Sequence, residues 1–202
     1  MKKISILVSI LIAFFHINAW SFGTHLNSSQ VLRSGEYDIS TFGQFFSDDR
    51  RGGYAAAMID LPFSSETNWR FYAGGGSFNY AFGGQLKWVP VQQLRQNYFS
   101  LGLTLGFDYG RDDGFGFLLT RITPFISRDF SWEFGRFEPY FALPLGTIFV
   151  DSDSEFYTQA AVGTHVKFDN LKYMRFSIEG GFNVENAQSY LALMATIQLT
   201  QK

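Results

Sequence analysis

Alternation of apolar and small polar residues dominates the middle of the chain. In residues 98–109, YFSLGLTLGFDY, aromatic and leucine side chains occupy every second position, and Ser, Gly, Thr and Asp lie between them. Successive side chains of a strand point to opposite faces, so this pattern predicts a strand with one oily face and one small, polar face. A strand facing water usually carries Lys and Glu instead. The combination is typical of a transmembrane β-barrel, with lipid outside and a crowded polar lumen inside.

From residue 35 onward the chain divides into about ten such segments, each near the length that a tilted strand needs to cross a bilayer. The predicted strands are residues 35–46, 53–62, 69–76, 80–90, 98–109, 115–128, 137–149, 156–168, 173–184 and 190–199. An even count returns both ends of the chain to the periplasm. The sequence therefore predicts an all-β fold, a single antiparallel up-and-down transmembrane barrel of about ten strands, with eight as the alternative.

The alternation assigns side chains to the two sides of the predicted barrel wall. Those predicted to face lipid are Phe99, Leu101, Leu103, Leu105, Phe107, Phe176, Ile178, Phe182, Leu191, Leu193 and Ile197. Charged residues fall on the other face and form a predicted lumen charge network: Asp38, Asp60, Arg70, Lys87, Asp108, Glu138, His165, Lys167, Arg175 and Glu179, with Gln85, Gln159 and Gln198 between them.

Buried charges are tolerated when they pair and hydrogen-bond. In so narrow a barrel we expect the network to plug the lumen, with Glu179 paired to Lys167 or Arg175. A gated channel for small solutes or ions is the alternative.

Three positions do not fit regular strands. Pro139 and Pro144 cannot donate to a ladder, so we expect Pro139 at a strand start and Pro144 at a bulge. In residues 115–128, Arg121 falls on the face begun by Phe117 and Leu119, which predicts a bulge near Thr120.

The N-terminus predicts export. Lys2 and Lys3 precede an apolar run over residues 4–15, and small residues follow at Ala19 and Ser21, as in a secretory signal peptide. We therefore assign residues 1–21 to a signal peptide and residues 22–202 to one barrel domain. The chain has no cysteine, which excludes disulfides and thiolate metal sites and is consistent with a Gram-negative envelope. A net charge of −2 without a basic block excludes a nucleic-acid footprint.

The connections also differ in charge. The acidic ones, residues 47–52, 110–114 and 151–155, alternate with the non-acidic residues 91–97 and 169–172. We assign the acidic connections to the cell surface, as solvated turns.

Candidates for catalysis are few. His165 is the one histidine on a predicted strand, and no motif places a Ser or Asp beside it, so we interpret it as a structural lumen residue. The pairs Asp48/Asp49 and Asp112/Asp113 are more simply turn formers. The glycine-rich residues 73–84 lack the following Lys and helix of a phosphate loop. We therefore predict no catalytic residue, no cofactor and no metal, and a chain that is not an enzyme.

The last four predicted strands, FEPYFALPLGTIF, FYTQAAVGTHVKF, MRFSIEGGFNV and YLALMATIQL, resemble the closing strands of small OmpA-type, porin-family outer-membrane barrels, in which a Pro-Tyr pair like Pro139–Tyr140 is common. The resemblance implies a bacterial outer-membrane location and a monomer. It implies outer-membrane lipid, lipopolysaccharide and the barrel-insertion machinery as partners. A lipid-modifying barrel enzyme and a soluble, lipocalin-like periplasmic carrier are the alternatives, and the carrier would reverse the two faces.

Overall fold

The computed structural model describes Leu26 and residues 28–47, 52–77, 79–93, 98–112, 115–150 and 153–200. The predicted signal peptide over residues 1–21 and the turn residues Asp48, Asp49 and Asp113 lie outside the described residues. Within the described part of the chain, no helix is long and apolar enough to cross a membrane.

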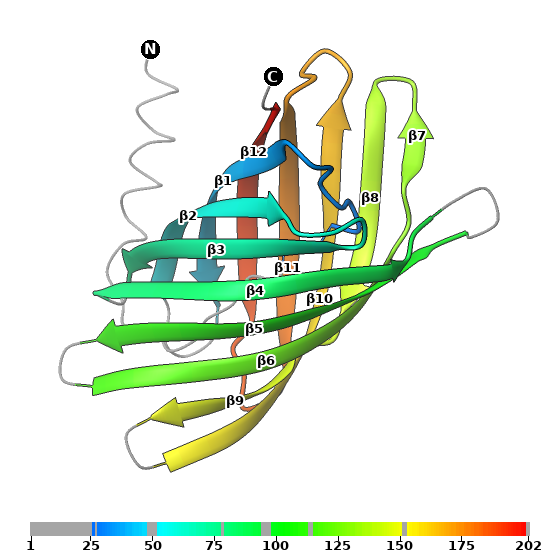
Figure 1. Ribbon diagram of the computed structural model, residues 1–202. Helices are drawn as coiled ribbons and strands as arrows, with labels where there is room; N and C mark the ends of the chain where they lie inside the picture. Colours follow the sequence, from blue (N-terminus) through cyan, green and yellow to red (C-terminus); the bar gives the residue numbers. More distant parts are fainter. Residues whose placement is uncertain are drawn as a thin grey trace.

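The described residues form twelve strands of one sheet (Figure 1). These are β1 (Glu36–Phe46), β2 (Gly52–Pro62), β3 (Thr67–Gly76), β4 (Tyr80–Val91), β5 (Ser100–Asp112), β6 (Phe115–Ser127), β7 (Phe130–Trp132), β8 (Gly135–Ala142), β9 (Leu145–Val150), β10 (Asp153–Phe168), β11 (Met174–Glu185) and β12 (Tyr190–Thr200).

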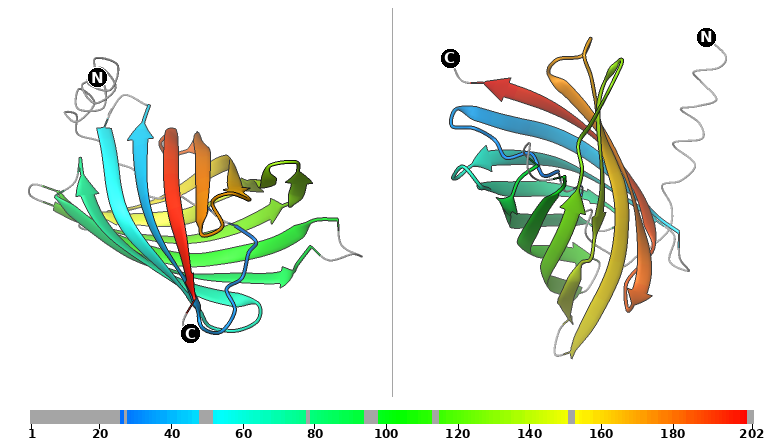
Figure 2. Two further views of the ribbon diagram at one scale, coloured as in Figure 1. Left: turned by 90° about the horizontal axis from the view of Figure 1, so that it is seen from above. Right: turned by 90° about the vertical axis from the view of Figure 1, so that its right-hand side faces the viewer.

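The sheet closes on itself. Strand β1 pairs antiparallel with both β2 and β12, between which it lies in the left view of Figure 2, and β10 pairs with β11. Strands β8 and β9 lie end to end, because both pair with β6 on one side and β10 on the other. Together they make one wall strand, so the described residues form a closed antiparallel barrel of ten strands, and the predicted fold class is confirmed.

The expected irregularities take a different form. Strand β6 pairs with β5 in unbroken register from Phe115 to Ser127, so the predicted bulge near Thr120 is wrong. Phe117 and Leu119 instead face inward on the same side as Arg121. A register shift occurs elsewhere, between Trp88 and Val91 in β4.

The two prolines also depart from expectation. Pro144 separates β8 from β9, yet the register with β10 is the same before and after it, so the strand is interrupted without an inserted residue. Pro139 lies inside β8, not at its start, and its carbonyl accepts a hydrogen bond from the main-chain N–H of Arg128. Strand β8 begins earlier than expected because it forms an additional hairpin with β7.

The barrel has two distinct ends. We call the end where β1 begins and β12 ends the terminus end, and the opposite one the loop end. The strand directions place the three acidic connections at the loop end and the two non-acidic ones at the terminus end, although residues 48–51, 94–97, 113–114 and 151–152 lie outside the described residues. All tryptophans of the described part, Trp69, Trp88 and Trp132, lie exposed near the terminus end.

Candidate functional site

The interior of the barrel is the candidate site. All ten residues of the predicted charge network lie on the inner face, and seven of them are buried: Asp38, Asp60, Arg70, Lys87, Asp108, His165 and Glu179. Glu138, Lys167 and Arg175 are half-buried near the terminus end. The side chains predicted to face lipid lie on the outer face, where all but the half-buried Leu103 are exposed.

Aromatic and apolar side chains fill the half of the lumen toward the loop end. This aromatic core contains Phe42, Phe46, Tyr54, Met58, Tyr72, Phe117, Leu119, Tyr157, Tyr190 and Met194. Inner-face glycines make room for such rings on the neighbouring strand: the directly paired residues are Tyr72 with Gly83, Phe117 with Gly110, Phe125 with Gly102, Tyr140 with Gly163, Tyr157 with Gly146, and Tyr190 with Gly181. The alternation predicts a predominantly polar lumen, so the aromatic core departs from that prediction.

The chain before β1 runs inside the barrel. We call Leu26 and residues 28–34 the N-terminal segment. In Figure 1 it lies between β1 to β3 on one side and β8 and β10 on the other, and its contacts reach strands on opposite sides of the wall. Leu26 is fully buried and packs against the aromatic core. Sequence reasoning missed this segment, because residues 22–34 lack the alternation of a strand.

Leu26 is held at both of its main-chain polar groups. Its N–H donates to Glu179 Oε2 (2.7 Å), and its carbonyl accepts from Arg70 Nη1 (3.5 Å). Arg70 in turn forms a bidentate pair with Asp60, at 2.6 and 2.9 Å, directly across β2 and β3. Buried carboxylates and guanidinium groups of the wall therefore bind the main chain of the segment.

Glu179 differs from its predicted role. Its carboxylate accepts hydrogen bonds from the hydroxyls of Tyr140 (2.6 Å) and Tyr190 (2.7 Å), in addition to the Leu26 N–H. The expected pairing with Arg175 is wrong, because Arg175 lies nearer the terminus end and bonds Asp38 instead (2.8 Å).

Four further wall residues hold the rest of the segment. Glu138 accepts hydrogen bonds from Ser28 Oγ (3.0 Å) and from the N–H and hydroxyl of Ser29 (both 2.7 Å). Lys87 Nζ donates to the carbonyls of Ser28 (3.0 Å) and Gln30 (2.6 Å).

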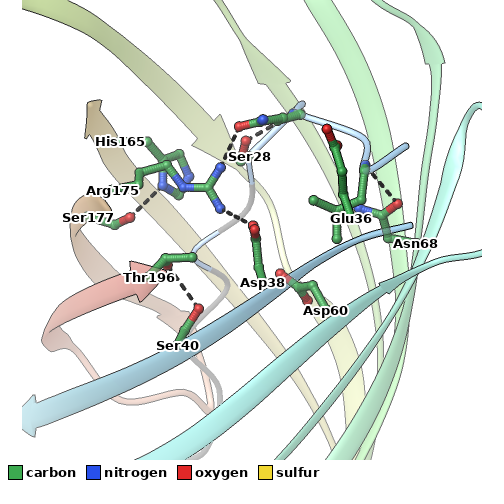
Figure 3. A network of polar contacts seen from close by, with 12 residues as sticks. Ser28, Glu36, Asp38, Ser40, Asp60, Asn68, His165, Arg175, Ser177 and Thr196 are labelled. Atoms are coloured by element: carbon green, nitrogen blue, oxygen red, sulfur yellow. Dashed lines mark hydrogen bonds and ion pairs between the residues drawn. The ribbon is translucent and has the colours of Figure 1, made fainter. Parts of the chain in front are cut away.

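Arg175 and Asn68 complete this set of contacts. Figure 3 shows Arg175 of β11 reaching across to Asp38 of β1, and its second nitrogen donates to Gln30 Oε1 (2.6 Å). Asn68 Oδ1 accepts from the Leu32 N–H (3.2 Å). Strands from several sides of the barrel thus share one partner, the N-terminal segment.

A second buried ion pair lies away from the segment, inside the aromatic core. Arg121 Nη2 is 3.1 Å from Asp108 Oδ2 and donates to the Tyr72 hydroxyl (2.7 Å), and both charged side chains are almost fully enclosed. Asp108 belongs to the charge network predicted from the sequence and Arg121 does not, because the expected bulge near Thr120 left the face of Arg121 unassigned.

The lumen widens into a cavity at the terminus end, which we call the vestibule. Its volume is about 850 Å³, and the N-terminal segment, the turn after β2 and the ends of β8, β10 and β11 line it. The charged residues that line it are Arg33, Asp129, Arg136, Glu138, Lys167 and Arg175, with His165 beside them. Burial, with repulsion from Glu138, raises the pKa of Asp129, which lies in the turn after β6.

His165 has two chemically relevant neighbours in register. Its Nδ1 is hydrogen-bonded to Ser177 Oγ at 2.6 Å (Figure 3). On the other side, Glu138 is the direct partner of His165 in the register of β8 and β10. The Tyr140 ring stacks on the imidazole with 5.1 Å between centroids. A row of Glu, His and Ser crosses β8, β10 and β11, although no sequence motif connects these residues. Among the described residues, no group of three or more His, Asp or Glu side chains is arranged to hold a metal ion.

Comparison with known proteins gives matches in structure only. No family model and no curated protein matches the chain. Similar solved structures include the N-terminal β-barrel domain of Pseudomonas aeruginosa OprF (13% identity, 82% of this chain and 98% of that one, TM-score 0.37). Two others are LpxR from Salmonella typhimurium (8%, 80% and 99%, 0.44) and the outer membrane protease OmpT from Escherichia coli (10%, 82% and 94%, 0.38).

One sequence-based expectation is corrected at this point. The chain was expected not to be an enzyme, and this is contradicted, because the similar barrels include a protease. The assignment to the OmpA or porin type stays a prediction, since no family model supports it.

Proposed function

We propose that the chain is a bacterial outer-membrane β-barrel protein with a structural or surface role in the cell envelope, and that its own N-terminal segment keeps the lumen closed. The observation that carries the proposal is the distribution of side chains: charged groups lie inside the barrel around the segment, and apolar groups lie exposed outside.

The outer face supports a lipid environment. Leu105, Phe107, Leu191 and Leu193 are each between 46% and 48% exposed along the middle of their strands. In water, so continuous an apolar surface would promote aggregation. A soluble, lipocalin-like carrier would have its apolar side chains inside, so the observed faces favour the membrane alternative. Tryptophans gathered near one end are typical of a membrane–water interface.

Two layers support a closed lumen. The aromatic core fills the half toward the loop end, and the N-terminal segment crosses the other half beside the vestibule, with its polar groups bound to the wall. A channel for small solutes would require both layers to move. The charge network was predicted to plug the barrel by itself, and we now assign it the task of holding the segment.

Membrane fractionation tests the location. We expect the protein in the outer-membrane fraction, resistant to extraction by urea and carbonate. In detergent, we expect the unheated protein to migrate differently on a gel from the boiled protein, because a closed barrel keeps its hydrogen-bond ladder until it is heated. Recovery of the folded chain from the soluble periplasm would contradict the proposal.

A second candidate is hydrolytic activity at Ser177, and the row of Glu138, His165 and Ser177 favours it. A serine hydroxyl bonded to an imidazole that has a carboxylate beside it is the arrangement that activates a nucleophile. A fluorophosphonate probe should then label the native protein and neither Ser177→Ala nor His165→Gln. Absence of labelling in the native protein, with and without lipid, would leave the row a structural one.

A further inference from the structure

Three basic residues form a row across adjacent strands at the vestibule. Arg136 of β8 and Lys167 of β10 are direct partners in the register of the two strands. The paired register of β10 and β11 ends with Val166 opposite Phe176, so Lys167 lies next to Arg175 one residue further along both strands. All three residues line the vestibule, as does Arg33 of the N-terminal segment.

The acidic groups of the vestibule balance only part of this charge. Arg175 is paired with Asp38 at 2.8 Å, and Arg136 lies 3.9 Å from Asp129, which is a weak, exposed contact. Glu138 also lines the vestibule and keeps its negative charge, because its partners Ser28 and Ser29 are neutral, but among the described residues it makes no salt bridge with the row. Among the described residues, Lys167 makes no salt bridge. Lys167 is therefore a basic side chain of the vestibule without a direct ionic partner.

Like charges directly opposite each other on neighbouring strands destabilise a sheet. The row of Arg136, Lys167 and Arg175 places three positive charges side by side. An acidic residue at the central position would remove the repulsion, but the chain has Lys167 there. An anion between the three side chains would also remove it, and would be bound by two guanidinium groups and an ammonium group.

We infer that the vestibule binds a small soluble molecule with two or more phosphate or carboxylate groups, held by the row Arg136, Lys167 and Arg175. The cavity of about 850 Å³ is within the size range of small-molecule sites. The three side chains face the lumen, so the ligand comes from solution at the terminus end and not from the lipid around the barrel. Binding at the vestibule does not depend on whether the lumen conducts.

Calorimetry on the folded, full-length protein in a neutral detergent at low salt tests the site. Pyrophosphate and citrate are the phosphate and carboxylate probes, and trehalose is the uncharged one. We expect at least one of the two anions to bind with a dissociation constant below about 1 mM, and trehalose not to bind. Lys167→Gln should weaken anion binding at least about tenfold, and Lys167→Arg should retain it. The matched control is Lys172→Gln, which makes the same charge change on an exposed turn outside the vestibule.

Thermal unfolding gives a second readout. The bound anion should raise the unfolding midpoint of the native protein and of Lys172→Gln, and should leave that of Lys167→Gln unchanged. Without anion, Lys167→Gln should not lower the midpoint, because it removes a repulsion. Failure of both anions to bind would overturn the inference. Equal weakening by Lys167→Gln and Lys172→Gln would also overturn it, as would a lower midpoint of anion-free Lys167→Gln, which would show that Lys167 is already paired.

Discussion

Gly102 and Phe125 illustrate how single residues shape the lumen. They are direct partners on β5 and β6, and a Cβ atom at Gly102 would overlap the Phe125 ring. Phe125 is buried and lies flat against the wall because its partner has no side chain. Several of the glycines that the sequence places on the polar face, Gly102 among them, therefore make room for aromatic rings, which is a denser filling than a wet, polar lumen would need.

Gly102→Ala should destabilise the barrel by about 1–3 kcal/mol, because an added methyl group in a filled interior forces the ring to move. Gly43→Ala is the matched control, since no atom lies within 4 Å of the added Cβ atom. Urea unfolding in lipid vesicles would measure both. Equal stability of the two variants would contradict the packing of Phe125 over Gly102.

At the scale of the strand, β5 shows why alternation decides which environment a side chain meets. Leu105 is exposed near the middle of the strand, whereas its neighbour Thr104 is buried beside Lys87, its direct partner on β4. A change of one position along the strand therefore exchanges the outer face for a filled, charged lumen.

Leu105→Arg should reduce folding stability in lipid vesicles by about 2–4 kcal/mol, because it places a charge in the hydrocarbon near the middle of the bilayer. Asn170→Arg, in an exposed turn at the terminus end, should have little effect. The measurement is the unfolding free energy of each variant in vesicles. If the barrel were soluble, both arginines would face water, and the two variants would then be equally stable.

At the scale of the whole molecule, the closed barrel is filled from two sides. The N-terminal segment is held by residues that are far apart in sequence, among them Arg70, Glu138 and Glu179. Each contact ties the segment to a different part of the wall, so we expect the segment to be ordered only when the barrel is closed. The aromatic core beneath it blocks the lumen independently.

In planar bilayers, the native protein should therefore show no steady conductance. Glu138→Ala removes three hydrogen bonds to Ser28 and Ser29 and should loosen the segment without opening a pore. The chain has no cysteine, so Leu32→Cys provides a single reporter that is buried in the native protein. Thiol labelling at this position should be several-fold faster in Glu138→Ala than in the control Glu155→Ala, whose side chain is exposed at the loop end. Steady ohmic conductance of the native protein would contradict the closed lumen.

The sequence by itself determined the strands and their faces. Alternation with a period of two depends only on local backbone geometry, so it placed Asp38, Lys87 and Glu179 inside and Leu105 and Ile178 outside without knowledge of any partner. It also located nearly every strand boundary to within a few residues, because turn-forming residues interrupt the alternation.

Partners, in contrast, were decided only by the tertiary structure. Which residues meet inside a barrel depends on the stagger between strands and on its diameter, and neither is encoded in one strand. Ser177 thus lies beside His165 because β10 and β11 pair in one particular register. Glu179 binds two tyrosines and the main chain of Leu26 because closure brings β8, β12 and the N-terminal segment around it. The segment has no periodic pattern of its own, and its contacts are with residues that only the closed barrel brings around it.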